Sequence, residues 1–455
     1  MIMLIASGVI ALAAAVVLVM VVALVKSHPS IGIVLVGLSV IPLWEASRPP
    51  PLVTLAGLSI FPADVITFSL LVVGVLEFAQ LQANLRGWLV PWLLFGALIA
   101  FSLLRGVVAF GLGTAINEAR EIVWFFFAMT WALSIHPSRL KLHTASLVLG
   151  WALVVVGLYH GVVYGIGDAS SWVFLDDGTR KAGRLLVSQQ ALILVCCAGV
   201  VFLGSSRSGK SRPRFVASSL VFLGVVVLAQ IRSVWIAASV GIVAVLIWSG
   251  QKRVRNRVFV MLVAGGSLVL IGWFSGMLKS IGSELIASAS NTDTLDWRTS
   301  GWQTLISRAI ANGPVAVAGG EPFGSGYVRR VEGGAWTVVA PHSWYVEIFL
   351  RLGIIGLTVL AATLIPAVAK SRASRSMWTF LLVVVGISGW ADTVDWYVAP
   401  WLGAAMVASL GAGRAAQGVI TSASSVNLDA ARSARERIGA SGSNSSPSPS
   451  EVGLR

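Results

Sequence analysis

A histidine followed by a serine, His342 and Ser343, stands at the mouth of an apolar helix predicted by the segment PHSWYVEIFLRLGIIGL, residues 341–357. A long hydrophilic segment precedes this helix, so we expect the pair to lie at a membrane surface. Histidine has its ordinary pKa near neutral pH, which makes His342 a candidate to take or give a proton there. A lone histidine at a helix mouth is also typical of an interfacial residue, and the remaining residues must decide between these interpretations.

The composition predicts an all-α, polytopic membrane protein. The 455 residues are 56% hydrophobic and 11% charged, which is more apolar surface than a soluble core of this length needs. Many of the 18 Trp, including Trp92, Trp131 and Trp401, stand near the ends of apolar runs, as is typical of interfacial belts. The runs predict about 12–13 transmembrane helices, at about 1–25, 31–44, 60–79, 88–104, 115–134, 144–165, 185–203, 215–231, 233–249, 258–276, 343–366, 379–391 and 397–412.

The charge pattern predicts the topology. The net charge of +14 falls mainly in short loops between the apolar runs, which indicates a role in orientation and makes a nucleic-acid partner unexpected. The basic loops 205–214 and 251–257 should be cytoplasmic, and alternation then places the 277–342 loop outside. Four parts are expected: transmembrane helices 1–10 over 1–276, the extracytoplasmic loop 277–342, the C-terminal transmembrane helices 343–412, and a disordered cytoplasmic tail, 413–455.

Several polar residues gather on the side of the membrane that this topology places outside. Arg232 interrupts an otherwise apolar stretch, so it marks either a turn whose Arg reaches the headgroups or a polar cavity. The 277–342 loop contains an amphipathic helix that begins near Asp293 and includes Arg298; it is a membrane-surface helix or a lid with solvated arginines. Gly324 and Gly326 permit a tight turn or a close approach of the backbone to a ligand.

A metal site is the less favoured interpretation of the acidic residues. Asp176 and Asp177 are adjacent and have the oxygen ligands that a divalent cation prefers. A solvated loop is preferred because no further oxygen or imidazole ligands are grouped with them. We therefore expect neither a metal nor another cofactor.

These residues, in this order, resemble the O-antigen ligase and polymerase family of bacterial membrane glycosyltransferases. The resemblance is carried by the segment 341–357 with its His, acidic residue and Gly-containing helix, by IRSVWIAAS, and by DWRTSGWQTLI followed by PFGSGY. It extends over roughly residues 60–365. Ser343 departs from the Asn that is common in the family, and Gln189 or Gln190 lies where family members often carry Asn.

The resemblance implies glycan transfer on the outer face of the bacterial cytoplasmic (inner) membrane. The donor is a polyprenyl-diphosphate-linked glycan, and the acceptor is a glycan or a lipid. Carried onto this chain, Arg232 and Arg298 would hold the diphosphate, with Arg184 as a secondary candidate, and His342 would orient or deprotonate the acceptor hydroxyl. The family needs no metal for transfer, which agrees with the residues found here.

The sequence leaves other functions open. Ligase and polymerase share the donor and differ in the acceptor; polymerisation is preferred because nothing in the sequence indicates a lipopolysaccharide acceptor. A lipid-linked sugar flippase or other polysaccharide transporter also has many spans and cationic groups, but transporters tend to bind near the membrane midplane. A membrane scaffold without chemistry is the third interpretation.

Overall fold

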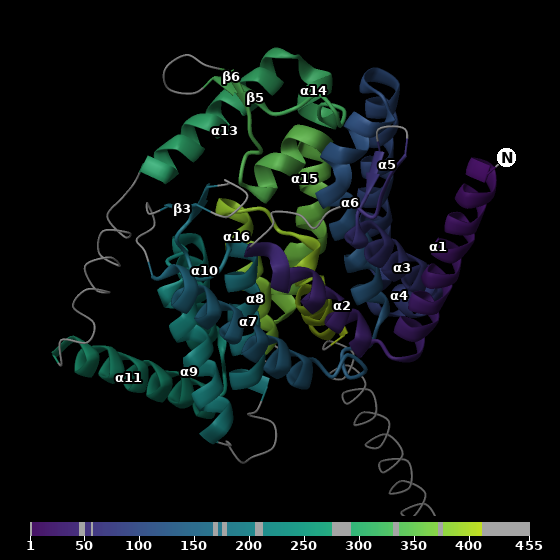
Figure 1. Cartoon of the computed structure of the whole chain (residues 1–455). Helices are drawn as coiled ribbons and strands as arrows, with labels where there is room; N and C mark the ends of the chain where they lie inside the picture. The colour runs from purple at the N-terminus through teal and green to yellow at the C-terminus, as the bar shows by residue number, and fades with distance from the viewer. Residues whose placement is uncertain are drawn as a thin grey trace, which may run out of the picture. The chain divides into compact units, whose positions relative to one another are not determined.

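The computed structural model describes residues 2–44, 51–55, 58–166, 172–174, 180–204, 213–274, 293–330, 336–371 and 376–411. Asp176, Asp177 and the expected tail, 413–455, lie outside these ranges. Within these ranges, each of the thirteen predicted apolar runs is largely helical (Figure 1). Within the described ranges, Phe78–Phe110, Leu142–Tyr164 and Trp344–Ser371 are long and apolar enough to cross a bilayer, and seven more helical segments are apolar but shorter. The protein is an all-α membrane protein.

The helices follow one another with few strands between them. Their bounds are α1 Ile2–Ser27, α2 Ser30–Val40, α3 Pro62–Leu76, α4 Phe78–Leu85, α5 Leu89–Phe110, α6 Leu112–Ser134, α7 Leu142–Tyr164, α8 Ser188–Gly204, α9 Pro213–Leu228, α10 Arg232–Trp248, α11 Lys252–Phe274, α13 Asp293–Ala311, α14 Pro314–Gly319, α15 Trp344–Ser371 and α16 Ser376–Ala391. Residues 399–411 form a further helix. Three antiparallel hairpins interrupt the series: Val53–Leu55 with Leu58–Ile60, Trp172–Phe174 with Arg180–Ala182, and Val328–Arg330 (β5) with Trp336–Val338 (β6).

The helices of the first compact unit, residues 1–410, pack in two groups. In one group α6 packs against α3, α4 and α5, and α1 packs against α3; in the other, α8 packs against α7, α9 and α16, and α10 packs against α16. Helix α15 joins the groups because it contacts both α5 and α16. The 3₁₀ segment Trp396–Val398 makes a second connection through its packing on α6.

Three of the tryptophans expected at membrane interfaces are core residues. Trp92, Trp131 and Trp401 are each at most 1% exposed. The indole N–H of Trp92 donates to Thr130 Oγ1 at 3.1 Å, and that of Trp401 donates to Ser146 Oγ at 2.9 Å. Their large apolar rings fill the space between helices, so the interfacial interpretation was wrong for these three residues.

Helix α15 is broken at Gly353, a feature that its continuous apolar pattern hides. Gly353 has φ +66°, and the segment before α15 crosses it so closely that a Cβ here would lie 2.1 Å from the carbonyl oxygen of Ala318. The break frees the backbone carbonyl groups of Leu350 and Arg351, and each accepts a hydrogen bond from another segment. Glu321 N donates to Leu350 O at 2.7 Å, and Ser102 Oγ donates to Arg351 O at 2.9 Å.

Helix α13 is the amphipathic helix expected in the long loop. Its buried stripe consists of Trp302, Leu305 and Ala309, and it packs against α14, α15 and β5. Ile310, in the last turn of the helix, is 59% exposed. The helix covers protein rather than only a membrane surface, as a lid does, but Arg298 and Arg308 are bonded to Ala391 O and Glu321 rather than solvated.

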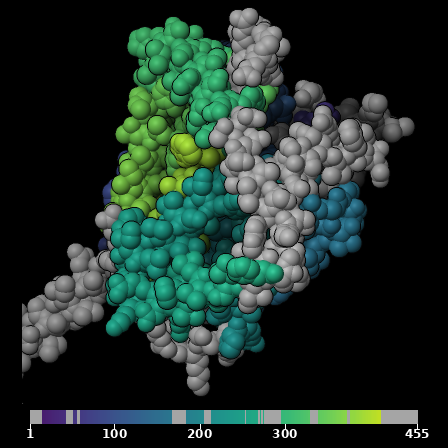
Figure 2. Space-filling view, turned by 90° about the vertical axis from the view of Figure 1, so that its left-hand side faces the viewer, coloured from purple at the N-terminus to yellow at the C-terminus, as the bar shows by residue number. Residues whose placement is uncertain are grey.

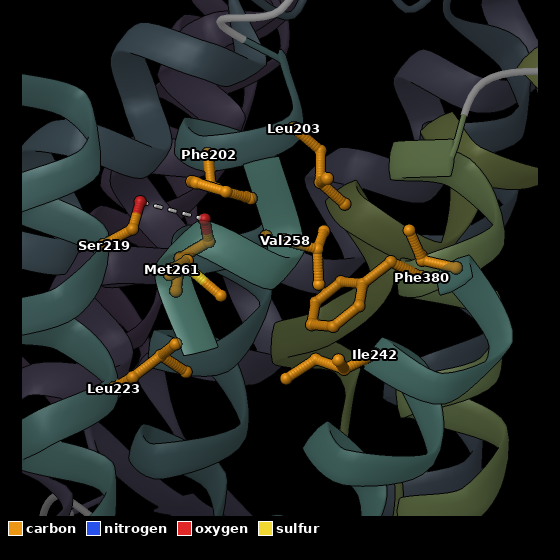
Figure 3. Close-up of a pocket in the computed structure, with 11 residues that line it drawn as sticks. Phe202, Leu203, Ser219, Leu223, Ile242, Val258, Met261 and Phe380 are labelled. Carbon is orange, nitrogen blue, oxygen red and sulfur yellow. Dashed lines mark hydrogen bonds between the residues drawn. The ribbon is translucent and has the colours of Figure 1, made fainter. Parts of the chain in front are cut away.

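An apolar cavity lies between α8, α9, α10, α11 and α16 (Figure 3). Its volume is about 30 Å³, and its lining includes Phe202, Met261 and Phe380. The hydroxyl of Ser219, the polar side chain in its wall, is already bonded to Ala198 O and Phe215 O. A space of this size and chemistry is a gap in packing and cannot hold a charged substrate.

Replacement of Gly353 by alanine tests the close crossing at the helix break. The added methyl group meets the Ala318 carbonyl and forces a left-handed conformation on a residue with a Cβ, so we expect a loss of about 2–4 kcal/mol and a lower thermal unfolding midpoint in detergent. Gly224→Ala in α9 is the control, because open space surrounds that position. An equal midpoint for both variants would contradict the described break.

Candidate active site

Three arginines from separate parts of the sequence meet at one end of the helices. Arg184 precedes α8, Arg232 is the first residue of α10, and Arg298 lies in α13. Burial, and next the positive charges of Arg232 and Arg298, lower the pKa of Arg184, whereas the carboxylate of Asp392 acts in the opposite direction. Such charge effects need groups that lie close together. The structure thus brings together the three arginines that were predicted as diphosphate ligands.

Helix α13 is fastened to this end by two of its side chains. The Arg298 guanidinium donates to the carbonyl oxygen of Ala391, the last residue of α16, and the Trp302 indole N–H donates to Pro341 O. In the space-filling view, the yellow-green surface at the end of α16 lies between the green surface of α13 and α14 and the teal surface of α10 (Figure 2). The arginines therefore sit where the long loop closes over the ends of the transmembrane helices.

His342 lies beside the arginine cluster. Its ring centroid is 6.0 Å from that of Trp297, the neighbour of Arg298, and the side chain is half-buried. The residue has φ +49°, which turns the chain sharply into α15. Ser343 is 1% exposed, and the next backbone N–H, from Trp344, donates to Asp392 O at 3.1 Å. The expected histidine and serine are therefore held in a fixed turn against α13 and the segment after α16.

The segment after α16 brings the carboxyl group of Asp395 to the same region. Burial, and next the charges of Glu121, Asp392 and Glu347, raise the pKa of the Asp395 carboxyl well above its usual range, while a hydrogen bond from Gln189 opposes this shift. Gln190 points elsewhere, because its amide donates to Val40 O at 3.0 Å and to Ile41 O at 3.1 Å. Of the two glutamines considered from the sequence, Gln189 is the one that reaches this region.

Gly324 and Gly326 form the expected tight turn, with φ +97° and +73°, but they belong to a different cluster. Gly326 N donates to Glu118 Oε2 at 2.9 Å, and Gly326 O accepts from Arg351 Nη2 at 3.0 Å. A Cβ on Gly324 would lie 2.9 Å from that of Phe110. The loop is thus fixed by its protein contacts and not by the arginine cluster.

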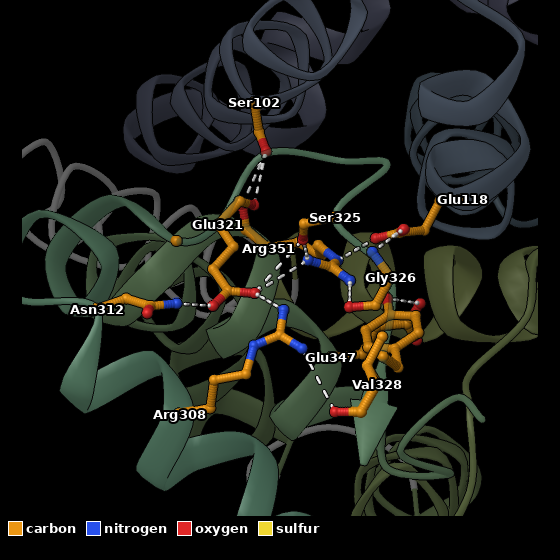
Figure 4. Close-up of polar contacts among 12 residues, drawn as sticks. Ser102, Glu118, Arg308, Asn312, Glu321, Ser325, Gly326, Val328, Glu347 and Arg351 are labelled. Atoms are coloured by element: carbon orange, nitrogen blue, oxygen red, sulfur yellow. Dashed lines mark hydrogen bonds and ion pairs between the residues drawn. The ribbon is translucent and has the colours of Figure 1, made fainter. Parts of the chain in front are cut away.

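Arg351 is the centre of this second cluster (Figure 4). Its side chain is 0% exposed; its Nε pairs with Glu118 Oε1, and its Nη1 lies 3.6 Å from Glu321 Oε2 and donates to Ser325 Oγ. Glu321 also accepts from Arg308 Nη2 at 2.9 Å and Asn312 Nδ2 at 2.6 Å. The buried guanidinium therefore ties α6, the turn at Gly326 and α13 to the first half of α15.

Tyr327 connects Arg351 to Glu347. Its ring lies 4.2 Å from the guanidinium carbon of Arg351, and its hydroxyl donates to Glu347 Oε1 at 3.2 Å. Burial, and next the charge of Glu347, raise the pKa of Tyr327 well above its usual range, which keeps the hydroxyl protonated as a donor. Glu347 stands in the first turn of the helix that follows His342, so Arg351 acts through Tyr327 on the entry to that helix.

Arg351, Tyr327 and Glu347 were not among the residues predicted from the sequence. The sequence did contain a signal for Arg351 and Glu347, because burying an arginine or a glutamate inside an apolar helix costs free energy unless the residue is paired or functional. Among the residues that the structure describes, no three His, Cys, Asp or Glu side chains gather as metal ligands.

The arginine cluster, the histidine turn and the loop between them lie in one segment of the sequence. Residues 217–361 match the O-antigen ligase family. The matched segment is about a third of the chain, and it contains Arg232, Arg298 and His342. It confirms the resemblance to the O-antigen ligase family that the motifs indicated. No curated protein matches the chain significantly. The match supports a function of the general O-antigen ligase or polymerase type, a glycosyltransferase-like reaction at a membrane.

The buried charge of Arg351 is open to a direct test. Arg351→Met leaves Glu118 without its cation and Glu321 with Arg308 alone, so we expect a loss of about 3–5 kcal/mol and a correspondingly lower unfolding midpoint. Arg308→Met is the matched control: it also removes a cation from Glu321, but its side chain is 32% exposed and should matter less. If both variants unfold at the same temperature, Arg351 does not have this role.

The raised pKa of Asp395 predicts how stability depends on pH. An unfolded aspartate ionises from about pH 4. The folded state holds its proton to a higher pH, so the stability that this group contributes is complete below pH 4 and is lost as the pH rises through the folded pKa. Asp395→Asn removes the titration. We expect the difference between the unfolding midpoints, variant minus wild type, to increase from pH 4 to pH 8. A difference that does not change with pH would contradict this.

Proposed function

We propose that this protein transfers a polyprenyl-diphosphate-linked saccharide to an acceptor hydroxyl on the outer face of the bacterial cytoplasmic membrane. One observation carries the proposal: the charges of Arg232 and Arg298 act on Arg184, and Arg298 bonds Ala391 O beside the turn that holds His342. Arginine binds phosphate oxygens through two parallel hydrogen bonds, each charged contact being worth about 1.5–3 kcal/mol. The family match supports a glycosyltransferase-like reaction in general.

The arginines bind the diphosphate and stabilise the charge that grows on it. As the acceptor oxygen bonds to the anomeric carbon, the bond from that carbon to the phosphate oxygen breaks, and polyprenyl diphosphate leaves with the electron pair. Because the diphosphate is already a good leaving group, positioning and charge stabilisation supply much of the rate. The burial of Arg184 strengthens its interaction with an anion.

His342 orients the acceptor hydroxyl and takes its proton on an imidazole nitrogen. The sharp turn at φ +49° and the contact with Trp297 hold the ring in place beside Arg298. A positioned general base of this kind contributes roughly 10²–10⁴ to the rate. Ligation and polymerisation share these steps and differ in whether the acceptor is a different molecule or a like glycan; we place polymerisation first.

Comparison of His342→Ala with wild type in the native host tests the proposal. We expect the variant, at equal membrane levels, to lose long or transferred surface glycan by about 10²-fold or more, and to accumulate short polyprenyl-linked units outside. The measurements are the extracted surface glycans and the lipid-linked precursors.

His136→Ala is the matched control. His136 is exposed and bonds Ser138 in the connection between α6 and α7, away from the arginine cluster. Unchanged glycans in His342→Ala would remove this residue from the reaction. Precursors trapped on the cytoplasmic side would instead indicate a flippase.

A further inference from the structure

An open cavity of about 670 Å³ lies beside the O-antigen ligase domain, between the start of α6 and the turn at Gly326. It is separate from the arginine cluster. Its lining consists of Phe110, Gly111, Leu112, Gly113, Thr114, Asn117, Glu118, Gly326, Tyr327 and Val338. The transfer reaction proposed above does not use this cavity. One of its walls is Tyr327, which contacts both Arg351 and Glu347.

The lining has the chemistry that carbohydrates need. Phe110, Leu112 and Val338 are 43%, 53% and 68% exposed, and such apolar surfaces fit the C–H faces of sugar rings. Asn117 and Glu118 add polar groups for sugar hydroxyls. Glu118 is charge-balanced by Arg351. Asn117 is exposed; its carbonyl oxygen accepts from Arg120 Nη1 at 2.7 Å, and its amide N–H groups, which no residue in the described ranges accepts from, can donate to a ligand.

The cavity is connected to His342 by a short stretch of backbone. Val338 lines the cavity, pairs with Val328 in the hairpin, and is followed by Val339, whose N–H donates to Tyr327 O at 3.3 Å. His342 comes four residues after Val338, which is at most about 14 Å along an extended chain. A glycan of a few sugars, reacting at His342, reaches the cavity along this stretch.

We propose that this cavity binds the saccharide chain of the acceptor, a few sugars away from the reacting hydroxyl. The inference rests on the proposed glycan transfer. The acceptor is assigned rather than the donor because the diphosphate is placed with Arg184 and Arg232 at α8 and α10, whereas the cavity is built on α5, α6 and the Gly326 turn. Attack on the anomeric carbon needs the hydroxyl opposite the leaving group.

Blocking the cavity with Thr114→Trp tests the proposal. Thr114 is exposed in the lining, and the change leaves the Glu118 to Arg351 pair in place. The probes are fluorescently labelled oligosaccharides of one to six repeats, prepared by partial hydrolysis of the host's own surface polysaccharide. We expect the Kd of the purified full-length protein for long probes to rise about tenfold, with little change for the single repeat.

Two further variants make the result decisive. Val108→Trp adds the same bulk at a position that is 86% exposed and outside the lining, so its Kd values should equal those of wild type. Asn117→Ala removes an amide without adding bulk and should weaken the long probes about fivefold if Thr114→Trp proves unstable. Equal binding of long probes by wild type, Thr114→Trp and Asn117→Ala, or no preference of wild type for long probes, would overturn the proposal.

Failure of this inference is distinguishable from failure of the proposed function. If His342→Ala abolishes transfer while the cavity variants bind normally, only the acceptor site is wrong. If the cavity variants lose binding while His342→Ala keeps full transfer, the cavity binds glycan and the proposed role of His342 is wrong.

Discussion

The buried pairing of Arg351 with Glu118 is the interaction on which the arrangement around His342 depends. A guanidinium that is removed from water is costly unless charged and polar partners surround it, and here Glu118, Glu321, Ser325 and the Gly326 carbonyl supply them. Because these partners come from α6, the turn at Gly326 and the residues after α14, one charge fixes several connections at once. Tyr327 extends the effect to Glu347 in the first turn of α15.

The helix break beside Arg351 explains how the long loop reaches the arginine cluster. The break at Gly353 lets residues 318–321 cross directly over α15, and the freed carbonyls of Leu350 and Arg351 become acceptors for Glu321 N and Ser102 Oγ. Helix α13 lies where α15 begins and α16 ends. There Trp302 donates to Pro341 O and Arg298 donates to Ala391 O. Positions far apart in the sequence are thereby held close to His342.

Much of this arrangement could be predicted from local patterns, and the parts that could not are tertiary. Apolar runs and the amphipathic repeat around Trp302 located the helices, because each pattern reports on one helix at a time. Arg232 was recognised because it interrupts an apolar stretch and Arg298 because it lies in the amphipathic helix, whereas the family resemblance made Arg184 a secondary candidate; the structure brings the three together. The break in α15, the burial of Trp131, and the attachment of Gly326 to Arg351 depend on neighbours from distant segments, which no local pattern specifies.

The most direct measurement of the central claim is release of polyprenyl diphosphate and formation of the new glycosidic bond by the purified protein in liposomes. The donor is a labelled polyprenyl-diphosphate-linked saccharide, supplied with an acceptor glycan. The account predicts that wild type makes the elongated glycan and that substitution of Arg232 or Arg298 by Gln slows its formation while the protein stays folded. Unchanged rates in both variants, or movement of the donor across the bilayer without bond formation, would contradict it.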